Sequence, residues 1–147
     1  MKILINNLEE LEQFAKTLTK LIQKEDVISL VGNLGAGKTT LVQMIGNEMG
    51  IKDNILSPTF SIINIYNGRD IIYHLDLYRL EDPSELEALD YETYFYPDGI
   101  TFIEWASQGQ GYLPEDMIEI KIEQIGDKRE IEILENSTRG KEISEQF

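Results

Sequence analysis

The residues best suited to chemistry form the stretch Gly32-Asn33-Leu34-Gly35-Ala36-Gly37-Lys38-Thr39. This stretch fits the pattern G-x-x-x-x-G-K-[ST], in which the glycines let the backbone fold around a phosphate and its N–H groups point at the anion. In that pattern Lys38 reaches the β- and γ-phosphates, and the Thr39 hydroxyl binds Mg²⁺. The alternative is a glycine-rich turn between a strand and a helix that binds nothing.

The flanking segments favour phosphate binding. Residues 27–31 (Val-Ile-Ser-Leu-Val) predict a buried strand, and the apolar positions Leu41, Met44 and Ile45 predict a helix that ends near Gly50. A strand before the loop and a helix after it are the context in which the motif binds nucleotides. We therefore predict a nucleotide site at this loop.

Two acids that follow hydrophobic runs are the next candidates. Asp76 closes the run 71–75, and Glu104 closes the run 100–103. Because α/β sheets bind ligands at the carboxyl ends of their strands, both acids are expected beside the phosphate loop. We predict that Glu104 holds Mg²⁺ together with Thr39, while Asp76 tunes the metal shell or the attacking water. Taken alone, each acid is equally well explained as an exposed carboxylate at a strand end.

Three further positions have both a functional and a structural explanation. Thr59, in Ser57-Pro58-Thr59-Phe60, fits a switch segment that senses the γ-phosphate, although a turn entering a strand also explains it. His74 shares a strand face with Asp76, and by itself is better explained as a structural histidine. Trp105 is either a core anchor or a surface aromatic that contacts a partner.

Composition limits the class of protein. The chain has 147 residues, 41% of them hydrophobic, with no cysteine and one histidine, which excludes disulfides, thiolate catalysis and a histidine cluster for a transition metal. The 27 acidic residues outnumber the 13 basic ones, and a net charge of −14 argues against autonomous nucleic-acid binding. We find neither a signal peptide nor an apolar run long enough to span a membrane, so we expect a cytoplasmic protein.

The elements that position these residues predict a single α/β domain over residues 1–147, with a three-layer fold like that of phosphate-loop NTPases. An antiparallel hairpin that turns at Asn67-Gly68 makes the central sheet mixed rather than purely parallel. Other expected elements are a helix beginning after Asn7, a short helix beginning after Asp82, strands around 118–122 and 131–133, and a polar tail at 136–147.

Four motifs in this order resemble the TsaE family, formerly YjeE, of small bacterial ATPases needed to form threonylcarbamoyladenosine in tRNA. They are Gly-Asn-Leu-Gly-Ala-Gly-Lys-Thr-Thr at 32–40, Ser-Pro-Thr-Phe at 57–60, His-Leu-Asp-Leu-Tyr-Arg-Leu at 74–80 and Ile-Glu-Trp at 103–105. The resemblance spans about residues 8–134. Its H-x-D-x-Y-R and I-E-W elements are far more specific than the phosphate loop.

The resemblance implies a cytoplasmic protein that binds ATP or ADP with Mg²⁺, hydrolyses ATP weakly alone and is stimulated by a TsaB–TsaD complex. TsaD transfers the threonylcarbamoyl group to tRNA, so the partners and not this chain would hold the tRNA. It further implies that Thr39 and Glu104 bind Mg²⁺ and that Asp76 is the other essential acid. The residues that it assigns to the nucleotide are Gly35, Ala36, Gly37, Lys38, Thr39 and Thr40, with Thr59 in a switch-like loop and Trp105 at a position important for activity.

Two positions depart from the family pattern. Asn33 stands where relatives usually carry an acid, and Ser107 stands where many have a second acid after Ile-Glu-Trp. Neither change touches the loop lysine, the Thr39 hydroxyl or the two strand-end acids. The departures therefore leave the predicted nucleotide site intact, and affect only what these two side chains contribute to turnover or partner contact.

Three other functions stay open. A small-molecule kinase would need further cations at the phosphates, and of Arg69, Arg79, Arg129 and Arg139 only Arg79 is expected near the site. A switch GTPase would carry D-x-x-G and N-K-x-D motifs, which this sequence lacks. A degenerate loop that serves only as a scaffold would leave the melting temperature unchanged when ATP is added.

Overall fold

The computed structural model describes residues 1–33, 35–53, 55 and 62–147, so the predicted switch segment with Thr59 lies outside the described residues. A seven-stranded sheet runs through this part of the chain in the order β1-β7-β6-β2-β5-β4-β3. Its strands are β1 (Lys2–Ile5), β2 (Val27–Val31), β3 (Ile63–Asn67), β4 (Ile71–Asp76), β5 (Ile100–Glu104), β6 (Ile118–Ile125) and β7 (Lys128–Ile133).

The sheet is mixed, as the sequence predicts. Strand β2 lies parallel to both β5 and β6, and β4 lies parallel to β5. The outer pairs β3–β4, β6–β7 and β1–β7 are antiparallel. Both predicted hairpins form, with Asn67 opposite Ile71 in the first and Gly126 in the turn of the second. Strand β1, to which the sequence analysis assigns no element, extends the sheet beyond β7.

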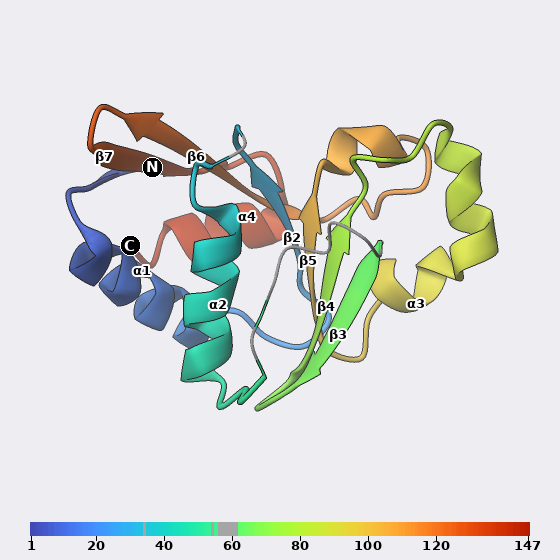
Figure 1. Ribbon diagram of the computed structural model, residues 1–147, viewed down its shortest axis with the longest axis horizontal. Coiled ribbons are helices and arrows are strands. Elements are labelled where there is room, and N and C mark those ends of the chain that lie inside the picture. The colour runs from blue at the N-terminus through green and yellow to red at the C-terminus, as the bar shows by residue number, and fades with distance from the viewer. Residues whose placement is uncertain (34, 54, 56–61) are drawn as a thin grey trace.

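Helices cover the two faces of the sheet in layers (Figure 1). Helices α1 (Leu8–Leu21), α2 (Lys38–Glu48) and α4 (Thr138–Ser144) contribute to one apolar cluster. The 3₁₀ helices η1 (Pro83–Leu89) and η2 (Ala106–Gly109), together with α3 (Tyr91–Phe95), contribute to a second cluster over β4 and β5. Among the described residues, no helix is both long enough and apolar enough to cross a bilayer.

Alternation along the strands separates these two clusters. In β2, Ile28 and Leu30 belong to the cluster with α1 and α2, whereas Val27 belongs to the cluster with α3. Successive side chains of a strand point to opposite faces, so a hydrophobic run such as Val27–Val31 supplies both cores at once. The central strands are therefore held firmly in place on both faces.

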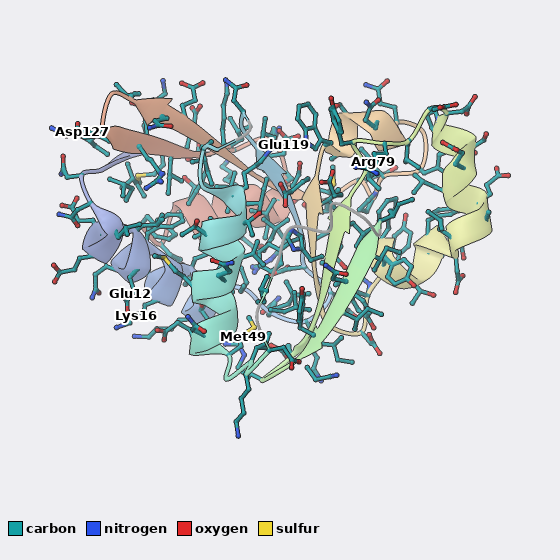
Figure 2. The ribbon with its side chains drawn as sticks, in the orientation of Figure 1. Glu12, Lys16, Met49, Arg79, Glu119 and Asp127 are labelled. Atoms are coloured by element: carbon teal, nitrogen blue, oxygen red, sulfur yellow. The ribbon has the colours of Figure 1, made fainter. Side chains whose placement is uncertain are left out.

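Helix α1 begins at the cap that the sequence predicts. The Asn7 side chain accepts a hydrogen bond from the backbone N–H of Glu10 at 2.9 Å. The Glu10 carboxylate in turn accepts one from the backbone N–H of Asn6 at 3.2 Å. On the outer face, Glu12 and Lys16 project from the helix (Figure 2), with Oε1 and Nζ 3.6 Å apart. Such an exposed pair contributes little stability, so packing of the apolar face carries the helix.

Residues 136–147 are not the polar tail that the sequence predicts. They contain α4, whose first turn is capped by a hydrogen bond from the Gly140 amide to the Ser137 hydroxyl at 2.9 Å, and Ile143 is buried in the core. Arg139 fixes the helix because its Nε and one terminal nitrogen each lie 2.8 Å from an oxygen of the buried Asp26 carboxylate. This partner is 113 positions away in the sequence, so local composition gives no sign of it.

Arg139→Ala should lower the free energy of unfolding by about 2 kcal/mol, because it leaves the Asp26 carboxylate buried without its cation. The backbone N–H of Gln23 still donates to that carboxylate at 2.8 Å, which limits the loss of stability. Urea denaturation measures the change. Glu142→Ala, which removes only the exposed partner of Arg139, is the matched control and should cost less than about 0.5 kcal/mol. Equal effects of the two changes would contradict the anchoring role of Asp26.

Candidate functional site

The phosphate loop joins β2 to α2 at the carboxyl edge of the parallel strands. Gly37 is the N-cap of α2 with φ +107°, and it offers no side chain to cap the helix. The first turn of α2 also carries no acidic residue, whereas Asn7 and Ser137 cap α1 and α4 with their side chains. The Gly37 cap therefore gives the first-turn amides of α2 no side-chain acceptor, an arrangement that favours an anion.

Two glycines of the motif are required by backbone geometry. A Cβ on Gly32 would lie 2.5 Å from the Ile122 carbonyl oxygen, so only glycine lets the loop start this close to β6. Gly37 adopts a positive φ that a side chain would disfavour. Between them, the Ala36 amide donates to the Asn33 carbonyl at 3.0 Å and closes a turn within the loop. The described residues of the motif therefore form the compact bend that the sequence predicts.

Lys38 reaches from the start of α2 into a buried position between the loop and β5. Its side chain is only 6% exposed, its Nζ donates to the Gly32 carbonyl at 2.7 Å, and it lies 3.7 Å from Oε1 of Glu104. Glu104 is itself 4% exposed, at the last position of β5. A lysine and a glutamate are seldom this buried unless they are paired, so the cation of the loop and the acid of β5 form one unit.

The two strand-end acids meet, as the sequence predicts. In the parallel pairing of β4 and β5, Asp76 lies directly opposite Glu104. Burial raises the pKa of the Asp76 carboxyl above its usual value, and the neighbouring Glu104 charge acts in the same direction. The hydrogen bond from the Tyr78 amide to Asp76 Oδ1, at 3.0 Å, and the Lys38 charge oppose that rise.

His74 is buried, as expected of a structural histidine, but its contact with Glu104 was not predicted from the sequence. The ring is fully buried, and its Nε2 lies 2.7 Å from Oε2 of Glu104, at hydrogen-bond distance. A carboxylate accepts, so Nε2 carries the hydrogen of this bond. Its Nδ1 is buried without a hydrogen-bond partner among the described residues. The sequence placed His74 on the same strand face as Asp76, which was the available sign of a place in the site. Its hydrogen-bond partner, Glu104, lies on the neighbouring strand β5.

The oxygen donors at this edge suit magnesium. Thr39 supplies a hydroxyl, while Asp76 and Glu104 supply carboxylates, and Mg²⁺ prefers such ligands. No group of three or more histidine or acidic residues that could hold a metal is found within the described part of the chain. Magnesium that accompanies a nucleotide needs only one or two protein carboxylates, because phosphates and water complete its shell. The residues therefore fit the metal that the sequence analysis expects.

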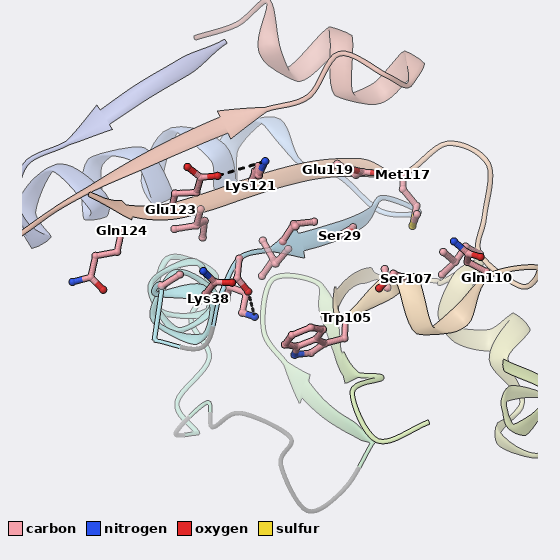
Figure 3. Close-up of a pocket in the computed structure, with 18 residues that line it drawn as sticks. Ser29, Lys38, Trp105, Ser107, Gln110, Met117, Glu119, Lys121, Glu123 and Gln124 are labelled. Atoms are coloured by element: carbon pink, nitrogen blue, oxygen red, sulfur yellow. Dashed lines mark hydrogen bonds and ion pairs between the residues drawn. The ribbon is translucent and has the colours of Figure 1, made fainter. Parts of the chain in front are cut away.

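Trp105 covers the lysine from the side of β5. It has φ +59°, an uncommon conformation for a bulky residue, at the N-cap of η2. Its ring lies beside the end of Lys38 (Figure 3), with Nζ 5.0 Å from the ring centroid, and the exposed Tyr78 ring lies 4.9 Å away on a tilt of 51°. A strained backbone that holds an aromatic ring over a buried cation is typical of a functional site.

A cavity of about 820 Å³ opens beside the loop, within the size range of ligand pockets (Figure 3). The loop and Lys38 bound one side, β6 bounds another, and the segment after β5 closes it. Asn33 and Ser107, the two departures from the family pattern, both line this cavity. Polar lining residues that Figure 3 labels include Ser29, Gln110, Glu119, Lys121 and Glu123.

The arginines are arranged differently from the expectation. Arg79 lies beyond the end of β4, where Figure 2 labels it. Arg129 of β7, which was not expected near the site, contacts the loop directly, with its Nε donating to the Ala36 carbonyl at 3.1 Å. The expectation that Arg79 alone lies near the site is therefore wrong, because the folded sheet brings Arg129 of β7 into contact with the loop.

Comparisons with known proteins agree with this geometry. The family model of the threonylcarbamoyl adenosine biosynthesis protein TsaE matches residues 5–131. The tRNA threonylcarbamoyladenosine biosynthesis protein TsaE of Haemophilus influenzae is 43% identical over 92% of this chain and 87% of its own length. The protein of the same name from Bacillus subtilis is 41% identical over 85% of this chain and 79% of its own length.

A solved structure is similar over the whole fold. The crystal structure of YdiB from Bacillus subtilis superposes with a TM-score of 0.84 at 32% identity, covering 99% of this chain and 92% of the other. The sequence match, the shared fold and the site at the carboxyl edge point to one conclusion. The chain belongs to the TsaE family, whose members take part in the biosynthesis of threonylcarbamoyladenosine in tRNA.

Proposed function

We propose that this chain is an ATPase that binds ATP or ADP with Mg²⁺ at the loop of residues 35–40 and supports tRNA threonylcarbamoylation together with a TsaB–TsaD complex. The observation that carries the proposal is the buried contact between Lys38, at the start of α2, and Glu104, at the end of β5. A phosphate-loop lysine and a strand-end acid held 3.7 Å apart are the groups that a nucleotide with its metal requires.

Each residue has a distinct task in this proposal. The amides at the start of α2 and the Lys38 ammonium bind the phosphates and offset their charge. Thr39 and Glu104 hold Mg²⁺, which stabilises negative charge on the phosphate oxygens when bound. The hydrogen bond from His74 to Glu104 fixes the orientation of that carboxylate. Asp76 orients water. Its raised pKa makes the ionised carboxylate a stronger base, better able to accept a proton from that water.

The partners complete the function. With a net charge of −14, this chain is a poor surface for a nucleic-acid backbone, so the proposal leaves tRNA binding to the TsaB–TsaD complex. The exposed Tyr78 ring packs beside Trp105, which lines the cavity, and offers an aromatic surface through which a partner could alter turnover. The proposal includes a cytoplasmic location, where ATP and the pathway proteins meet.

A melting experiment tests nucleotide binding directly. ATP·Mg²⁺ at a hundred times its dissociation constant should add about 2.7 kcal/mol to the free energy of unfolding. GTP serves as the competitor that distinguishes an ATPase from a switch GTPase. An unchanged melting temperature over a wide range of ATP concentrations would contradict the proposal and favour a loop that serves only as a scaffold.

Lys38→Ala should reduce ATP turnover at least about a hundredfold, since the phosphates lose their principal cation. The domain should remain folded, because the core clusters do not depend on this side chain. Steady-state ADP release and circular dichroism measure the two effects. Lys52→Ala, at an exposed position outside the site, is the control. Full activity of Lys38→Ala in the presence of the partners would refute the assigned role.

Glu104→Gln and Asp76→Asn should impair Mg²⁺-dependent hydrolysis more than nucleotide binding. The amides keep the size of the carboxylates and remove the charge that the metal or the water needs. We expect turnover to fall about a hundredfold while the ATP dissociation constant changes by less than about fivefold. Calorimetry with and without Mg²⁺ separates the two quantities. Parallel losses in binding and turnover would instead indicate that the acids maintain the structure of the site.

Adding the purified TsaB–TsaD pair should raise the ATPase rate of this chain by about tenfold or more, because a partner at the mouth of the site can order the catalytic groups. The control is the same pair with Lys38→Ala, which measures any contaminating ATPase. No stimulation by a partner pair that is active with another TsaE would count against the partner assignment, although it would leave nucleotide binding itself intact.

A further inference from the structure

Arg129 makes a contact with the phosphate loop that spans most of the chain. It lies in β7, opposite Gln124 of β6 and Ile5 of β1, and shares a strand face with the buried Ile131. Its Nε donates to the Ala36 carbonyl at 3.1 Å, across 93 positions of sequence. The side chain also packs against Gly37, where an added Cβ would come within 3.0 Å of Nε and 3.5 Å of Cζ.

Arg129 forms no ion pair with an acid in the part of the chain that the structure describes. Arg69 and Arg139 both form ion pairs with carboxylates, at 2.9 and 2.8 Å. For Arg129, no carboxylate lies within ion-pair distance among the described residues, although acidic residues outnumber basic ones by 27 to 13 in this chain. Among the described residues, the hydrogen bond to the Ala36 carbonyl is the polar contact recorded for the half-buried guanidinium.

The planarity of the peptide bond gives this contact a consequence. The Ala36 carbonyl and the Gly37 N–H belong to one trans peptide unit, so they point in opposite directions. A donor that holds the carbonyl on the β7 side therefore turns the Gly37 N–H away from β7. Gly37 has no Cβ and adopts φ +107°, so little else in the residue itself limits rotation of this peptide unit.

We propose that Arg129 is a positioning residue for the phosphate loop. Its Nε–H holds the Ala36–Gly37 peptide unit in the orientation that presents the Gly37 amide to the phosphates of a nucleoside di- or triphosphate. The inference rests on the proposed function, in which the loop binds such a nucleotide. It adds β7 to the nucleotide-binding site. The contribution of Arg129 is to orient a peptide unit of the loop, not to attract the phosphates by its charge.

Side-chain replacements separate geometry from charge. Glutamine carries its amide nitrogen at the same number of bonds from the backbone as Nε, so Arg129→Gln keeps a donor and removes the charge. Arg129→Met keeps the length of the side chain and removes both the hydrogen-bond donor and the charge. Arg129→Lys keeps the charge but has no donor at the position of Nε. Lys128→Met, on the exposed neighbour in the same strand, is the matched control.

ADP titration of each variant is the first measurement. We expect Arg129→Met to bind ADP about tenfold more weakly, the amount expected for loss of a hydrogen bond from a charged donor. Arg129→Gln should bind within about threefold of the wild type, whereas Lys128→Met should match it. ADP affinity of Arg129→Met equal to that of the wild type, or of Arg129→Gln as weak as that of Arg129→Met, would overturn the inference. If Arg129→Met does not fold, Arg129→Lys replaces it in the same comparison.

Amide hydrogen exchange of the nucleotide-free protein gives a readout that needs no ligand. A peptide covering residues 35–40 should exchange about tenfold faster in Arg129→Met than in the wild type, at an unchanged melting temperature. If the wild type binds no nucleotide, the proposed function fails, and this exchange rate alone decides the positioning role. Faster exchange would then support it, and unchanged exchange would overturn it.

Discussion

The site depends on the parallel pairing of three strands. Strand β2 leads into the phosphate loop, β5 ends at Glu104 and β4 ends at Asp76, and the register of these strands is fixed by buried side chains on both faces. A shift of one residue would turn every side chain of a strand to the opposite face. The two hydrophobic clusters forbid such a shift, and they thereby keep Glu104 beside Lys38 and opposite Asp76.

Because the register is fixed, a costly set of polar groups can be held inside the protein. Lys38, Glu104 and His74 are all nearly inaccessible, and each is bonded to at least one other member of the set or to the loop backbone. Burying charges costs more than a simple ion pair returns, so this cluster is poor evidence for stability and better evidence for function. The positive φ of Trp105, whose ring lies beside the lysine, belongs to the same pattern of strain at a working site.

Much of this arrangement could be predicted from the sequence because its signals are local. The loop, its flanking strand and helix, the two hairpins and the strand-end acids are each defined by residues close together in the chain, and the comparisons confirm the family. Other contacts, which join segments distant in the sequence, could not be predicted. Strand β1 has only four residues, and α4 is anchored by an ion pair from Arg139 to the distant Asp26. Likewise, His74 reaches an acid on the next strand, and Arg129 reaches the loop from β7. The role of Thr59 stays a prediction, since that residue lies outside the described part of the chain.

A crystal structure with a non-hydrolysable ATP analogue and Mg²⁺ tests the central claim most directly. The account predicts that the phosphates lie against the amides at the start of α2 and that Lys38 Nζ contacts them in place of the Gly32 carbonyl that it now binds at 2.7 Å. It also predicts a metal about 2.1 Å from oxygens of Thr39 and Glu104. An analogue bound away from Lys38, with the bend of residues 32–39 empty at saturating concentration, would contradict it.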